Sequence, residues 1–305
     1  FGAKCNWDPT TNRMILSSPS ILNIYSEDYR KDTFIFLKAI SAVIQNYGLN
    51  LHIDFEHLSI IKSSAAVMVF AEITAMQLLT DYQDIITFTQ PSNKFAKAIF
   101  SDFEFYKAIR PGTSKKVNNL LKEDCFFQSG TDPVKHAISA IMSLSRNGLH
   151  VLKPEAMIFQ ASILEAMSNV RHHSYPDHVD SYDKRWWQFV FFDKPNSYLH
   201  FVVYDRGMGI PESMKNISPG QYNEGEKIQH AMTLGISSKI NEPGRGKGSR
   251  EILKTYNEND NSSLLIYSGK GVYYKDKERN IVDVGEDSFS LKGTIIEWQI
   301  PNKAG

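Results

Sequence analysis

Cysteine is scarce in this 305-residue chain, which contains only Cys5 and Cys125. Two distant cysteines exclude a disulfide-rich secreted scaffold, and they lack the close spacing of zinc-binding cysteines. A reducing compartment suits this composition better than an oxidising one. We therefore expect a cytoplasmic protein.

Long hydrophobic runs and an excess of one charge are also missing. No stretch approaches the ~18 apolar residues of a membrane span, and no signal-peptide pattern opens the chain. Lys plus Arg and Asp plus Glu balance at 34 each, so no overall field favours a nucleic acid or a membrane surface. We expect neither as a partner. Because the chain begins with Phe1 rather than Met, the sequence leaves open whether a segment precedes it.

What is present is an ordinary globular composition, with 42% hydrophobic and 12% aromatic residues. The length and the alternation of helical and strand periodicities predict two domains of the α/β class. We place a first domain at residues 1–115, a polar linker at 116–130 and a second domain at 131–305. Helices are expected at residues 34–47, 63–79, 92–101, 133–142, 154–173, 226–234 and 249–256, and strands at 51–55, 85–89, 186–192, 198–204, 264–268, 272–275 and 294–300.

The most informative segment reads Asp-Arg-Gly-Met-Gly and begins at Asp205, directly after the strand expected at 198–204. An acidic side chain at the end of a buried strand offers one fixed hydrogen-bond acceptor, and Gly207 and Gly209 leave bare backbone beside it. Asp205 is suited to accept from an exocyclic amine such as that of adenine. A tight turn without a ligand uses the same residue types, so this alternative stays open.

Glu165 and Asn169 are four residues apart on the helix expected at 154–173, so they share one face with His172. Asparagine supplies a neutral oxygen that suits a hydrated magnesium ion. A carboxylate one turn away can take a proton from an attacking water or hydroxyl. Glu165 is therefore a candidate general base and Asn169 a candidate metal ligand. An ordinary amphipathic helix with a solvated face is the alternative.

Three alternating glycines, Gly244, Gly246 and Gly248, precede the helix expected at 249–256. Their amides and the helix N-terminus are able to wrap a polyphosphate, with charge added by the two basic residues between them. A flexible glycine loop without a ligand is the alternative. Farther on, Thr294 opens the last expected strand, where its hydroxyl could close a base pocket.

The order of these motifs resembles the GHKL, or Bergerat, ATP-binding fold over residues ~131–300. DNA gyrase, histidine kinases and the anti-sigma factor serine kinases share this fold, and the histidine-kinase-like and serine-kinase domains are the nearest. The resemblance implies a mixed sheet with helices on one face. It implies ATP and Mg²⁺ as cofactors, with Asn169 on the metal, Glu165 as the base and Asp205 on the adenine amine. The other nucleotide-binding residues that it implies are Gly207, Gly209, Gly244, Gly246, Gly248 and Thr294.

The first domain resembles a STAS domain, of the anti-sigma factor antagonist type, over residues ~20–110. The strand at 51–55 and the segment Ile-Ile-Lys-Ser-Ser-Ala-Ala at 60–66 carry this resemblance. In phosphorylated members a hydroxyl at the helix N-terminus accepts phosphate, and Ser63 and Ser64 stand at that position. Lys62 replaces the aspartate usual there, which favours a plain helix cap at Ser63.

Together these features predict a magnesium-ATP-binding regulatory protein that acts in signalling through a partner protein, as an ATPase or a serine protein kinase. The alternatives are a switch that binds nucleotide without hydrolysing it and a protein-interaction module. A long helical hairpin with an exposed histidine is missing, which argues against a typical histidine kinase. A homodimer is compatible with the sequence, which does not require one.

Overall fold

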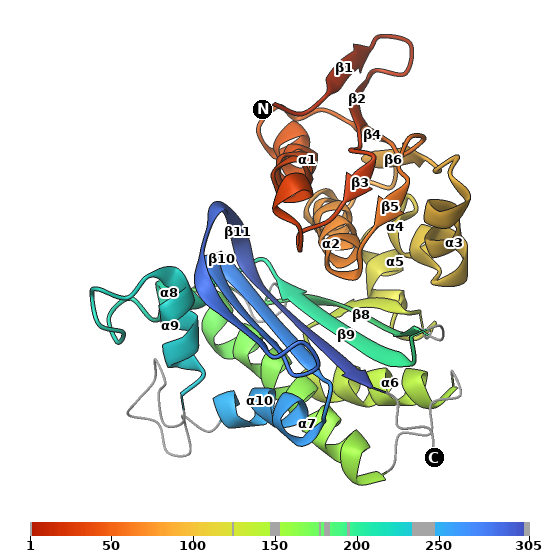
Figure 1. The fold of residues 1–305 in the computed structure, drawn as a ribbon. Helices are drawn as coiled ribbons and strands as arrows, with labels where there is room; N and C mark the ends of the chain where they lie inside the picture. The colour runs from red at the N-terminus through yellow and green to blue at the C-terminus, as the bar shows by residue number, and fades with distance from the viewer. Residues whose placement is uncertain are drawn as a thin grey trace. The chain divides into compact units, whose positions relative to one another are not determined.

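The computed structural model describes residues 2–123, 125–146, 153–176, 178–179, 184–193, 196–233 and 248–301. The chain divides into two compact units, Phe1–Ser129 and Gly130–Gly305, called unit 1 and unit 2 (Figure 1). Helices and sheets occur throughout, which confirms the predicted α/β class. The segment expected as an irregular linker, 116–130, instead contains the end of one helix and a complete strand.

Unit 1 is built on a four-stranded sheet with the order β1-β2-β4-β6. β1 pairs with β2 antiparallel, whereas β2, β4 and β6 run parallel. Parallel neighbours need a crossover connection, and helices α1 and α2 lie in these connections. The elements of this unit are β1 (Cys5–Asp8), β2 (Arg13–Ser17), β3 (Ile21–Leu22), α1 (Glu27–Gln45), β4 (Leu51–Asp54), β5 (Ile60–Ile61), α2 (Ser63–Thr80), β6 (Ile86–Thr89), α3 (Lys94–Asp102), α4 (Phe105–Ile109) and α5 (Ser114–Asn119).

Helix α2 is the central helix of unit 1, and every residue from Ser64 to Gln77 is buried. Its 18 residues have a mean hydropathy of 1.4, so the helix is long and apolar enough to cross a membrane. The expectation that the chain contains no such run is therefore wrong. Of this window, 78% is buried inside the protein, which is the behaviour of a core helix packed on all sides.

Unit 2 contains a five-stranded sheet with the order β10-β11-β9-β8-β7, and helices α6, α7 and α10 cover one face (Figure 1). Where a mixed sheet was expected, β8, β9, β11 and β10 pair antiparallel in turn. Alternate residues of β9, such as Phe201 and Val203, join Phe159 of α7 in one apolar core. The elements are β7 (Phe127–Gly130), α6 (Pro133–Arg146), α7 (Lys153–Asn169), a π-helical turn η1 (Val170–Ser174), β8 (Trp186–Asp193), β9 (Tyr198–Asp205), α8 (Ile210–Ser213), α9 (Glu224–Ala231), α10 (Gly248–Glu258), β10 (Ser263–Asp276) and β11 (Ile281–Pro301).

β10 and β11 form one long hairpin of 14 and 21 residues. The sequence predicts a break after Ser268, because Gly269 and Gly271 are typical of a turn. The strand instead continues through them, with register shifts between Ser268 and Gly269 and between Gly269 and Gly271. A bulge of this kind accommodates extra residues without ending the strand. The expected break is therefore wrong, and the hairpin brings Ser268 opposite Thr294.

Candidate functional site

Asp205 is the last residue of β9 and is buried, with 3% of its surface exposed. Its Oδ1 accepts a hydrogen bond from the Gly207 N–H at 2.7 Å. The Ser174 hydroxyl and the Thr294 N–H also donate to this carboxylate. The turn after β9 thus wraps back onto Asp205, which becomes the centre of a buried polar cluster.

Burial raises the pKa of Asp205 to about 7, because removal from water disfavours the charged form of the carboxyl. The hydrogen bonds from Gly207, Ser174 and Thr294 lower the pKa, but burial outweighs them. Both protonation states are therefore populated near neutral pH. A carboxyl perturbed by burial in this way is a candidate functional group.

Gly207 and Gly209 are both required by contacts inside the protein. A side-chain carbon on Gly207 would lie 2.0 Å from the carbonyl oxygen of Ser174, which accepts the Met208 N–H at 2.7 Å. Gly209 has a φ of +84°, and an added carbon would lie 2.8 Å from the Ser268 hydroxyl oxygen. The expected reason for these glycines, contact of their bare backbone with a flat ligand, is therefore not needed to explain them.

Thr294 lies beside Asp205, because β11 and β9 pair at these two residues. Its hydroxyl oxygen is 2.9 Å from that of Ser268, and the two are hydrogen-bonded. Ser268 also accepts the N–H of Ile210, the first residue of α8, at 2.8 Å. Ser268 is not among the residues predicted from the sequence. Its only signal there is a hydroxyl at the end of an apolar strand, which by itself is not informative.

Glu165 and Asn169 lie on α7 and are half-buried. After Asn169 the helix changes to the π-helical turn η1, a rare form that is frequent at functional sites. His172, which we expected on one face with Glu165 and Asn169, lies within this π-helical turn and is exposed. The π turn ends at Ser174, whose hydroxyl donates to Asp205. The end of the helix that carries Asn169 is thereby attached to the end of β9.

One face of α7 meets helix α10. The hydroxyl oxygens of Ser162 and Thr255 are 2.6 Å apart, which joins the two helices. Glu165 and Asn169 follow Ser162 by three and seven residues, so helical spacing puts them on this same face. The candidate base and the candidate metal ligand therefore face the side of α7 on which α10 packs.

Of the expected lid glycines, Gly248 is the first residue of α10, whereas Gly244 and Gly246 lie outside the described residues. The hydroxyl of Ser249 donates to the carbonyl oxygen of Thr233, just after α9, at 3.4 Å. Helix α9 in turn packs against α8 and β10. These contacts bring the start of α10 to the same side of unit 2 as the turn that follows Asp205.

A cavity of about 290 Å³ lies against the polar cluster and is lined in part by Gly207 and Gly293. Its volume is at the lower end of the range for small-molecule sites. Gly207 lines it, whereas Asp205, Gly209 and Thr294 do not. Its charged lining residues are Lys215, Lys227, Lys292, Glu212 and Glu224.

Asn169 is the candidate metal ligand of unit 2. Within the described ranges, no group of three His, Cys, Asp or Glu side chains could hold a metal ion. Magnesium suits such a setting, because it keeps several waters and is usually held by one or two protein oxygens and by substrate phosphates. The neutral side-chain oxygen of Asn169 meets that requirement.

In unit 1, the expected helix cap at Ser63 is wrong. Lys62 occupies the N-cap position and makes no capping bond with its side chain, and Ser63 is the first helical residue. The hydroxyl of Tyr25 lies 2.9 Å from the Ser63 Oγ and donates to the Ser64 Oγ at 3.0 Å. Ser64 is fully buried, so Ser63 is the more accessible of the two hydroxyls.

A scan against protein-family models and a search of curated proteins find no match to this chain. The resemblance to the GHKL and STAS families therefore depends on the motif residues alone.

Proposed function

We propose that unit 2 binds magnesium-ATP and that the protein acts in signalling through a partner protein, as an ATPase or a serine protein kinase. The observation that carries this proposal is the buried carboxyl of Asp205, which lies beside Thr294 at the end of β9. Ser174 links that carboxyl to the helix of Glu165 and Asn169. A single buried acceptor next to a helix with a neutral oxygen ligand is the arrangement that the GHKL resemblance implies.

Each residue has a distinct task in this proposal. Asp205 accepts a hydrogen bond from the exocyclic amine of the purine, in a buried setting that strengthens polar contacts. The free amides at the start of α10 favour negatively charged phosphates. Magnesium, when bound, neutralises charge on the phosphates, and Asn169 is the residue that we assign to hold it. Glu165 accepts the proton of the attacking water or hydroxyl.

Stabilisation of the full chain by magnesium-ATP tests the proposal. At a nucleotide concentration 100 times the dissociation constant, the wild-type protein should gain about 2.7 kcal/mol, measured by urea unfolding. Asp205→Asn should lose most of this gain, because the amide keeps the shape but not the ionised acceptor. Asp283→Asn, at an exposed position of β11, is the matched control and should keep it. A wild-type protein that magnesium-ATP does not stabilise would refute the proposal.

The alternative is a switch that binds the nucleotide without hydrolysing it. Phosphate release separates the two functions. A catalytic Glu165 predicts that Glu165→Gln lowers turnover at least ~100-fold with binding retained. Glu258→Gln, exposed at the end of α10, is the control. Equal phosphate release from both variants would refute Glu165 as the base, and the absence of phosphate release from the wild-type protein would support the switch.

A further inference from the structure

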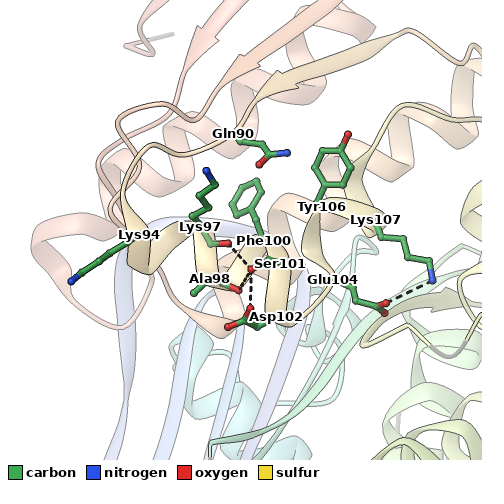
Figure 2. A pocket seen from close by; sticks show the side chains of 10 residues that line it. All are labelled: Gln90, Lys94, Lys97, Ala98, Phe100, Ser101, Asp102, Glu104, Tyr106 and Lys107. Carbon is green, nitrogen blue, oxygen red and sulfur yellow. Dashed lines mark hydrogen bonds and ion pairs between the residues drawn. The ribbon is translucent and has the colours of Figure 1, made fainter.

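A second cavity, of about 630 Å³, lies within unit 1 between helices α3 and α4 (Figure 2). Gln90, the first residue after β6, borders it. The cavity therefore opens close to the carboxyl end of a parallel strand, which is where open α/β sheets bind their ligands. Its volume lies within the usual range of small-molecule sites.

The floor of this cavity is the ring of Phe100, which is 2% exposed. Edge-to-face contacts hold that ring against Phe105, at 4.9 Å between centroids, and against Phe55, at 5.4 Å. Tyr106, on the opposite wall, is held in the same way against Phe88 at 5.5 Å. The aromatic surface is therefore fixed before any ligand arrives, and aromatic rings gain from packing against it.

Some of the charges around the cavity are paired. The Lys107 ammonium lies 3.2 Å from a Glu123 carboxylate oxygen and 3.9 Å from one of Glu104. Burial opposes the charge of Lys107, but its interactions with Cys125, Glu123 and Glu104 outweigh burial and raise its pKa. On the acidic side, the Asp102 carboxylate accepts the Ser101 hydroxyl at 2.8 Å.

Unlike Lys94, whose ammonium points away, Lys97 has its ammonium near Phe100 in Figure 2. Lys97 has no ion-pair partner within the described part of the chain, whereas the other lysine of this helix, Lys94, lies over the Phe95 ring at 5.0 Å. Figure 2 shows the ammonium of Lys97, the amide of Gln90 and the hydroxyl of Tyr106 spread around Phe100. The cavity thus combines an apolar aromatic floor with the Lys97 ammonium and two neutral polar groups, and its lining also includes the charged side chains of Lys94 and Asp102.

We propose that this cavity binds a small aromatic carboxylate, with its ring on Phe100 and Tyr106 and its negative charge at Lys97. A single ammonium with neutral donors matches a single negative charge. A phosphate dianion fits less well, because the carboxylates of Asp102 and Glu104 line the same cavity and no arginine does. A cationic ligand would be repelled by Lys97.

The test uses 2-naphthoate and its neutral analogue 2-naphthalenemethanol, titrated into the full chain by isothermal calorimetry. The wild-type protein should bind the carboxylate at least ~5-fold more tightly than the alcohol, since a hydrogen bond to a charged group is stronger than a neutral one. Lys97→Met should abolish that preference. Lys31→Met, an exposed lysine on α1 outside the cavity lining, is the matched control and should retain it.

A second variant tests the cavity itself. Ala98→Trp places a large side chain on α3 at the cavity wall and should remove binding of both compounds, with folding checked by thermal unfolding. Undetectable 2-naphthoate binding to the wild-type protein would overturn the proposal. So would equal affinity for acid and alcohol, or an equal loss of preference in the Lys97 and Lys31 variants.

Discussion

Two ionisable side chains with neutral hydrogen-bond partners can be compared between the units: Lys116, half-buried in unit 1, and Asp205, buried in unit 2. The Lys116 ammonium donates to Gln77 Oε1 at 2.8 Å and to the Ala108 carbonyl oxygen at 2.6 Å. Burial lowers the pKa of Lys116 to about 7, with a further contribution from Arg110, and burial raises the pKa of Asp205 to about 7. Burial thus lowers the pKa of a base and raises the pKa of an acid, so that the two pKa values become similar.

The surroundings of the two groups differ. Lys116 bridges α2, α4 and α5, because its partners Gln77 and Ala108 belong to the first two of these helices. It lines neither cavity. Asp205 instead stands at a strand end, next to a glycine turn that borders a cavity. A perturbed pKa alone therefore does not distinguish a structural contact from a functional group, whereas its position in the fold does.

The largest effect is expected for Asp205→Asn. The folded state holds the Asp205 proton more tightly than the unfolded chain, so the stability from this carboxyl is complete below about pH 4 and is lost as the pH rises through about 7. A difference of about three pKa units corresponds to on the order of 4 kcal/mol. Urea unfolding from pH 4 to 8 should therefore show a smaller loss of stability in Asp205→Asn than in wild type. Identical pH profiles would mean that the pKa of Asp205 is the same in the folded and the unfolded protein.

Lys116→Met should reveal the opposite pH dependence, with a somewhat smaller effect of about 3 kcal/mol because the residue is only half-buried. Here the folded state holds the proton of Lys116 less tightly than the unfolded chain. The stability that Lys116 contributes is therefore complete above about pH 10.5 and is lost as the pH falls through about 7. Between pH 7 and 10, wild-type stability should rise relative to that of Lys116→Met in urea unfolding. Lys115→Met, its exposed neighbour, should behave as wild type, and a matching rise in Lys116→Met would contradict this account.

Gly207→Ala tests the turn that follows β9. It is expected to have the smallest of these effects, a decrease of about 2 kcal/mol in the free energy of unfolding. The added carbon would meet the Ser174 backbone, which a side-chain rotation cannot relieve. Gly220→Ala is the control, because nothing lies within 4 Å of its added carbon. Thermal unfolding should show a lower Tm for the first variant and a nearly unchanged Tm for the second. Equal Tm values would show that the backbone at Ser174 can move away from the added carbon at little cost in stability.

Much of the fold was predictable where the signal is local. The helix expected at 154–173 corresponds to α7 with η1, and the strands expected at 186–192 and 198–204 correspond to β8 and β9. Periodicity identifies such elements because one face of each is buried along its whole length. Short elements such as β3, β5 and α4 have too few residues to show a period, and the sequence analysis missed them.

The candidate site was predictable only in part. The order of the motifs along the chain could suggest that Asp205 and Thr294 are neighbours. They are neighbours because β9 and β11 pair at these two residues. Ser174 and Ser268 were missed, since each acts through contacts with residues about 30 or more positions away in the chain. The structural need for glycine at position 207 could not be predicted either, because the atom that excludes a side chain there belongs to Ser174.

The amino-acid order by itself determined the α/β class, most long elements and the residue types that a nucleotide site would require, because these follow from spacing along the chain. Tertiary structure alone decided how far Asp205 is removed from water, which oxygen faces Gly207 and which lysine at the cavity of unit 1 is left unpaired. Solvation and charge pairing depend on atoms that are distant in sequence and close in space, and no local pattern records them.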